Sequence, residues 1–143
     1  MNARAVKRTG AAVLALQAGY LLLMHLAFAI FAGETGEPRP AGGPDLRYLA
    51  LMAAVLLVLL ASAAVLALPA LAGRTPWWVR APLLAGAVVL QLYVIMSALS
   101  NAGDQGFEPD SVLNVVMTLL ALVAAAASVL GLRGVPAATA ATE

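Results

Sequence analysis

The sequence predicts an all-α polytopic membrane protein, an antiparallel bundle of four transmembrane helices with both termini in the cytoplasm. Hydrophobic residues make up 63% of the 143-residue chain and charged residues only 10%, and the mean hydropathy is +0.95. All fifteen charges fall outside the apolar interior of four long stretches. A charge at the centre of a spanning helix costs roughly 2.5 to 3.5 kcal/mol on insertion scales, so membrane spans are kept free of charges. We expect one membrane domain, residues 1–134, and a disordered tail, residues 135–143.

The first predicted span covers about residues 10–32, after a basic start and before Gly33, which favours a helix end. A cleaved signal peptide is the alternative, but the apolar run exceeds the roughly 7 to 15 residues of a signal core. The next segment, residues 34–45, holds three Pro and three Gly and reads as an irregular loop.

The second span is predicted over about residues 46–72, with Asp45 as its N-cap. The connection that follows, residues 73–80, is short, so we expect the second and third spans to be neighbours in a hairpin. The third span is predicted over 81–100 and the fourth over 111–132.

The distribution of basic residues predicts the orientation. Lys and Arg are enriched in cytoplasmic loops, and a cytoplasmic N-terminus places six of the eight bases on that side: Arg4, Lys7, Arg8, Arg74, Arg80 and Arg133. Within that side, Trp77 and Trp78 stand between Arg74 and Arg80, and these four residues are expected to anchor the chain at the headgroup level. Seven Arg against one Lys, with abundant Ala, is typical of GC-rich bacterial genomes, so we expect a bacterial cytoplasmic membrane.

The fourth span carries a regular stripe of small and polar residues. Its members alternate by three and four positions, the spacing of one helical face: Ser111, Asn114, Thr118, Ala121, Ala125 and Ser128. Such a stripe lets helices approach closely, so we interpret it as a helix-packing seam. A hydrated pathway is the alternative.

His25 is the only histidine and, tyrosines apart, the only ionisable group embedded in a span. An intramembrane ionisable group raises a functional hypothesis by default. His25 is therefore a candidate, with Tyr93, Ser97 and Asn114, for a polar pocket in the outer half of the membrane. The plainer interpretation, which we favour, is a neutral imidazole hydrogen-bonded between helices.

No motif for catalysis, cofactor or metal binding stands out. A single histidine is too few for bis-histidine haem ligation, and the chain has no cysteine. Three carboxylates near the second outer loop, Asp104, Glu108 and Asp110, lack the spacing of a calcium loop. A membrane enzyme that uses them is the least supported interpretation, so neither catalytic residues nor a cofactor are predicted.

We therefore expect a non-catalytic accessory or scaffold subunit that acts through helix contacts with a membrane partner or with itself. The alternative is a small homo-oligomeric transporter, or a protein that binds a lipid or quinone in the pocket around His25. The expected partners are membrane lipid and a membrane protein or a second copy, with no nucleic acid. An outer carboxylate enzyme remains a distant third.

Overall fold

A computed structural model describes residues 3–31, 46–104 and 109–133, which form α-helices apart from short connections. Four of the helices are long and apolar enough to cross a membrane, over Ala3–Ala27, Leu46–Ala67, Trp77–Ser100 and Val115–Arg133. The predicted all-helical class with four possible membrane spans is confirmed. The predicted tail, residues 135–143, lies outside the described residues. The helices are α1 (Ala3–Phe31), α2 (Leu46–Ala67), α3 (Pro69–Arg74), α4 (Trp77–Asp104) and α5 (Pro109–Arg133).

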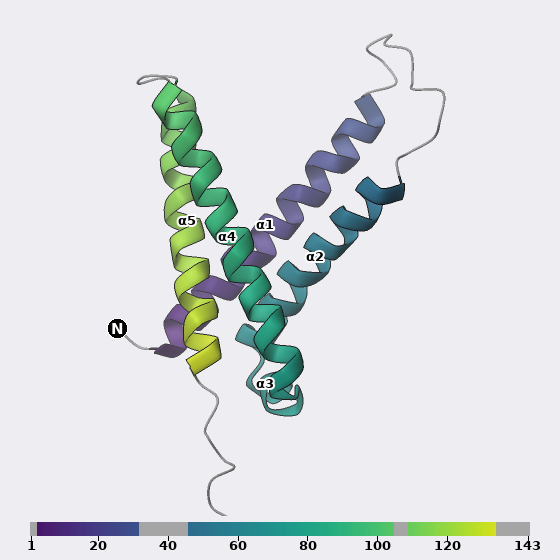
Figure 1. The fold of residues 1–143 in the computed structure, drawn as a ribbon, viewed down its shortest axis with the longest axis vertical. Coiled ribbons are helices and arrows are strands. Elements are labelled where there is room, and N and C mark those ends of the chain that lie inside the picture. The colour runs from purple at the N-terminus through teal and green to yellow at the C-terminus, as the bar shows by residue number, and fades with distance from the viewer. Residues whose placement is uncertain (1–2, 32–45, 105–108, 134–143) are drawn as a thin grey trace, which may run out of the picture.

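The long helices are arranged as two arms. Helix α1 packs along α2 to form the first arm, and α4 packs along α5 to form the second. The arms meet where α1 crosses α5 and diverge away from that crossing, so that Figure 1 shows a V. We call the joined side, where α1 begins and α5 ends, the basic end, because it carries Arg4, Lys7, Arg8, Arg74, Arg80 and Arg133. The opposite side, which carries Asp104 and Asp110, is the acidic end.

The second predicted span ends earlier than expected. Helix α2 stops at Ala67, not at residue 72, because Leu68 is extended with φ −107° and ψ 99°. The residue before a proline is disfavoured in the α-helical region, and Pro69 follows Leu68 directly. Pro69 then begins the short helix α3, a position that suits its fixed φ and missing N–H. The connection between the second and third spans therefore contains a helix that the sequence analysis did not predict.

Helix α4 begins earlier than expected, at Trp77 and not at residue 81. The carbonyl of Pro76 accepts the first bonds of the helix, from the N–H groups of Val79 at 3.1 Å and Arg80 at 3.0 Å. Pro82 consequently lies inside the helix and not in its first turn. Since proline has no N–H, it cannot donate to the carbonyl of Trp78, four residues back, so one helical hydrogen bond is missing near the start of α4.

The second and third spans, which were predicted to be neighbours, do not form the most extensive helix contact. Helices α2 and α4 do contact each other, and Ser62 Oγ on α2 donates a 3.3 Å hydrogen bond to the Leu83 carbonyl on α4. The contacts of α1 with α2, of α1 with α5, and of α4 with α5 are more extensive. The pairs α1 with α2 and α4 with α5, each connected through one of the two predicted outer loops, therefore form the arms. The crossing of α1 with α5 joins one arm to the other.

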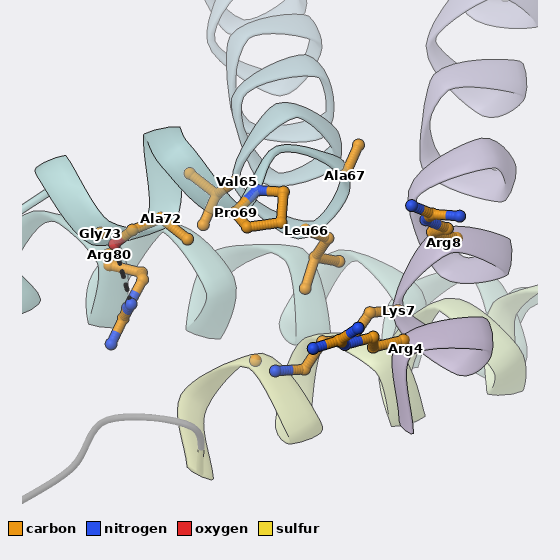
Figure 2. Close-up of a pocket in the computed structure, with 11 residues that line it drawn as sticks. Arg4, Lys7, Arg8, Val65, Leu66, Ala67, Pro69, Ala72, Gly73 and Arg80 are labelled. Carbon is orange, nitrogen blue, oxygen red and sulfur yellow. Dashed lines mark hydrogen bonds between the residues drawn. The ribbon is translucent and has the colours of Figure 1, made fainter. Parts of the chain in front are cut away.

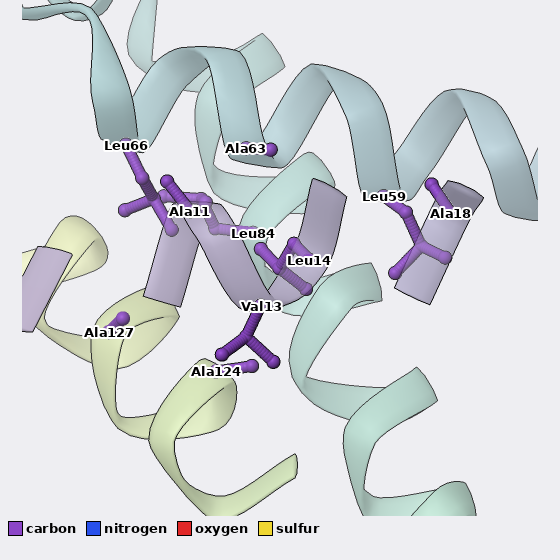
Figure 3. Close-up of a cluster of buried hydrophobic side chains, with 10 residues drawn as sticks. All are labelled: Ala11, Val13, Leu14, Ala18, Leu59, Ala63, Leu66, Leu84, Ala124 and Ala127. Atoms are coloured by element: carbon purple, nitrogen blue, oxygen red, sulfur yellow. The ribbon is translucent and has the colours of Figure 1, made fainter. Parts of the chain in front are cut away.

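The core lies at this joint, toward the basic end. Figure 3 shows its buried side chains, which come from four helices: Ala11, Val13, Leu14, Ala18, Leu59, Ala63, Leu66, Leu84, Ala124 and Ala127. A Cβ added at Gly10 would overlap the Cβ of Ala127, so α1 and α5 touch almost backbone to backbone. A Cβ at Gly131 would lie 2.8 Å from Leu66 Cδ2 and 2.9 Å from Leu84 Cδ1. Glycine and alanine thus set the distance between the arms.

Candidate functional site

A buried polar contact joins the two arms through a pair of amides. Gln17 on α1 donates from Nε2 to Gln91 Oε1 on α4 at 3.0 Å, and Gln91 donates back to Gln17 Oε1 at 2.9 Å. The two side chains are 8% and 1% exposed. In an apolar environment an unpaired amide is costly, so this reciprocal pair is a polar clamp across the joint.

Sequence reasoning missed this pair. A signal was present, because these are the only two glutamines within the predicted spans, and lipid offers an amide no hydrogen-bond partner. Matching polar groups at similar depth on different spans would have suggested the contact.

His25 makes two hydrogen bonds, and both lie in the first arm. Its Nδ1 is 2.6 Å from the carbonyl oxygen of Leu21, and its Nε2 is 2.5 Å from the hydroxyl oxygen of Tyr48 on α2. A carbonyl only accepts, so Nδ1 carries the proton and donates. In a neutral ring Nε2 then accepts from the Tyr48 hydroxyl. The ring is thus an interhelical hydrogen-bond partner with both nitrogens engaged.

The other residues of the hypothetical pocket lie elsewhere. Tyr93 and Ser97 belong to α4, in the second arm, and both are exposed, Tyr93 at 73%. Among the described side chains the structure does not bring either of them to His25, because the arms diverge toward the acidic end. The side chain of Asn114 lies outside those described. The residue that does meet His25 is Tyr48, near the start of α2, which was not among the residues of the hypothetical pocket.

The predicted seam on α5 is buried along part of its length. Ala121 and Ser128 are fully buried, and Thr118 and Ala125 are half-buried; the side chains of Ser111 and Asn114 lie outside those described. Ser128 Oγ donates to the Ala124 carbonyl of its own helix at 2.9 Å and so does not bridge helices. The closest approach to α1 is displaced round the helix, to Ala124 and Ala127.

The predicted anchors lie together at the basic end. Trp77 and Trp78 are the first residues of α4 and are 65% and 66% exposed. Arg74 is the last residue of α3. Arg80 Nη1 donates to the Ala72 carbonyl at 3.0 Å, which ties the start of α4 to the end of α3. A cation at a helix C-terminus is stabilised by the helix dipole.

The described interior leaves few groups for chemistry. Its buried polar side chains, Gln17, Ser62, Gln91 and Ser128, all have hydrogen-bond partners. Within residues 3–31, 46–104 and 109–133, no group of three or more His, Cys, Asp or Glu side chains is placed to hold a metal ion.

Comparison with models of protein families, with curated protein sequences and with solved structures gives no match for this chain.

Proposed function

We propose that this protein is a non-catalytic accessory or scaffold subunit of a bacterial cytoplasmic membrane. It crosses the membrane four times as an antiparallel bundle with both termini in the cytoplasm. It acts through helix contacts with another membrane protein or with a second copy of itself. The observation that carries this proposal is a pair of exposed side chains with hydroxyl groups on α4, Tyr93 and Ser97.

The separation of charge between the two ends supports the membrane placement. Six bases gather at the basic end, whereas the acidic end carries Asp104 and Asp110 with one base, Arg47. The enrichment of Lys and Arg in cytoplasmic loops assigns the basic end to the cytoplasm. The exposed Trp77 and Trp78 then lie at headgroup level, where amphipathic rings are favoured.

Helix α4 presents two hydroxyl groups outward within an apolar span. Tyr93 and Ser97 are one helical turn apart and exposed, and Met96 between them is 63% exposed. No described residue forms a hydrogen bond with either hydroxyl. Lipid tails cannot supply one, whereas a helix of a second protein can offer both a polar partner and close packing. This face of α4 is the surface we assign to the partner.

The alternative functions fit the interior less well. A quinone or lipid headgroup that binds at His25 would have to displace Tyr48 from Nε2, since the other ring nitrogen already bonds Leu21. A transport path commonly requires charges or broken helices at the midplane. The described interior there is held by the satisfied pair of Gln17 and Gln91.

Photocrosslinking in native membranes tests the assigned face. A benzophenone amino acid replaces Tyr93 in one variant and Leu57, which is 68% exposed on α2, in a matched control. We expect one discrete protein adduct from position 93 and only diffuse lipid adducts from position 57. An adduct of twice the chain mass identifies a second copy, and any other mass must match a protein that co-purifies in stoichiometric amount. Equal labelling at both positions, or no protein adduct, contradicts the proposal.

Reporter fusions test the topology. An alkaline phosphatase or fluorescent reporter fused after Arg133 or inserted between Arg74 and Trp77 is expected to report the cytoplasm in both cases, because both positions belong to the basic end. Opposite locations for the two reporters would contradict four spans with both termini inside.

A further inference from the structure

A cavity of about 590 Å³ opens at the basic end, away from the pairs formed by His25 and Gln17. Its walls come from the start of α1, the end of α2, helix α3, the start of α4 and Gly131 of α5. Figure 2 shows Arg4 and Lys7 extending together from α1 beside Leu66, with Arg80 on the side formed by α3. Five helices therefore meet around one space.

The charged residues that line this cavity are all basic. They are Arg4, Lys7, Arg8 and Arg80, and neither Asp nor Glu is among the lining residues. Lys7 and Arg8 follow Arg4 by three and four positions, which places each of them next to Arg4 on the helix surface. Arg80 adds a fourth base from a different helix. Bases that line one cavity, with no acid among the lining residues, raise its positive potential and so favour the binding of an anion.

Arg80 shows a specific capacity for an anion. One of its guanidinium nitrogens, Nη1, is fixed by the Ala72 carbonyl at 3.0 Å. Its Nε is buried and has no hydrogen-bond partner among the described residues. A guanidinium has five donors in a rigid planar fork that matches phosphate geometry, so an anchored fork with spare donors suits a phosphate oxygen.

The rest of the lining is apolar. Val65, Leu66, Ala67, Pro69 and Ala72 supply it, at the break between α2 and α3. A free ion gains nothing from such a wall, whereas a molecule with a phosphate and a hydrocarbon part gains from both surfaces. Trp77 and Trp78, exposed at the start of the next helix, place this level at the bilayer interface.

We propose that this cavity binds one phosphate-bearing amphiphile, an anionic phospholipid whose headgroup lies among Arg4, Lys7 and Arg80. This site is separate from the α4 face assigned to a protein partner and does not depend on it. The bound lipid links α1 to the α3 and α4 segment, since its phosphate meets bases from both sides. It thereby stabilises the joint of the two arms.

Two further bases make a matched control, because a merely basic surface attracts anionic lipid without a site. Arg74 and Arg133 lie at the same end but do not line the cavity. The test compares two double variants. One combines Arg4→Gln with Lys7→Gln, and the other combines Arg74→Gln with Arg133→Gln. Both double variants lose two positive charges, so any difference reports position and not net charge.

Native mass spectrometry of the protein released from nanodiscs measures the binding. We expect the wild type to retain one phosphatidylglycerol per chain and no phosphatidylcholine. The Arg4/Lys7 double variant is expected to bind at least about tenfold more weakly, from the loss of charge-assisted hydrogen bonds, and the Arg74/Arg133 variant within about twofold of wild type. A third variant, Arg4→Lys with Lys7→Arg, keeps both charges and is expected to retain binding. Circular dichroism of all variants establishes that they fold.

Each of these measurements has a result that would contradict the proposed site. Equal weakening in the two double variants, or several loosely held lipids with no single stoichiometric one, would overturn the site in favour of diffuse attraction. Displacement of phosphatidylglycerol by millimolar inorganic phosphate or pyrophosphate would show that a free phosphate is the ligand and would overturn the lipid assignment. Retention of the lipid under those conditions supports it.

Discussion

The two ends of this molecule are held together in different ways. At the basic end, α1, α2, α4 and α5 share one core in which Gly10 meets Ala127 and Gly131 faces Leu66. Toward the acidic end the arms diverge, and the hydrogen bond of His25 with Tyr48 stays within the first arm. Among the described residues, the contacts that join the arms therefore lie on the side of the basic end. Substitutions at the joint should disturb the whole fold, whereas those toward the acidic end should disturb one arm or the contact with a partner.

The closest approach at the joint gives the largest expected effect. Replacing Gly10 with Ala places a methyl group where the Ala127 Cβ already lies. Separating α1 from α5 to make room should lower the free energy of unfolding in bicelles by about 3 kcal/mol, the upper part of the range for overpacking. In the matched control, Gly19→Ala, the new Cβ has no neighbouring atom within 4 Å. That variant should be neutral or gain up to about 1 kcal/mol from helix propensity. Equal responses would show that the crossing is not close-packed.

A cavity in the joint should have the next largest effect. Leu14 is 0% exposed, and truncation to Ala removes its packing with several helices. We expect a loss of about 2 kcal/mol, the low end for a buried leucine, because lipid removes most of the hydrophobic contribution and leaves the cavity cost. Leu16→Ala, at a position that is 66% exposed, is the control and should change stability little. A loss at Leu16 as large as that at Leu14 would contradict the assigned core.

The amide clamp can be isolated with a double-mutant cycle. Gln17→Leu leaves the amide of Gln91 buried without its partner. Each single substitution should therefore cost about 1 to 2 kcal/mol in the free energy of unfolding. The double variant, Gln17→Leu with Gln91→Leu, should cost less than the sum, since no unpaired amide remains. Strictly additive effects would show that the two amides do not interact.

The smallest expected effect belongs to the first arm. Tyr48→Phe removes the hydroxyl that bonds His25 Nε2. The loss should be about 0.6 kcal/mol, the average for interhelical hydrogen bonds in a membrane protein. Tyr93→Phe is the control, because no described residue bonds the Tyr93 hydroxyl, and the purified chain should keep its thermal stability. If both variants lose equally, the bond between His25 and Tyr48 carries no stability of its own.

Two features of the structure can be compared with what the local sequence predicts: the end of α2 and the hydrogen bonding of His25. The early end of α2 follows from Pro69, because the residue before a proline resists the helical conformation. The predicted second span nevertheless continued past this proline to residue 72. The expectation that His25 forms an interhelical hydrogen bond agrees with its contact with Tyr48. That partner did not follow from helical spacing, because the contact spans two helices.

The sequence alone determined the four apolar helices and the gathering of six bases on one side of them. Both follow from transfer energies that each segment experiences independently of its neighbours. Only the tertiary structure decided which helices pair, that Gln17 meets Gln91, and that Arg80 shares a cavity with Arg4 and Lys7. Apolar faces are nearly equivalent in hydropathy, so partner choice rests on shape. That shape is set here by Gly10, Ala127 and Gly131, whose lack of bulk lets the arms meet.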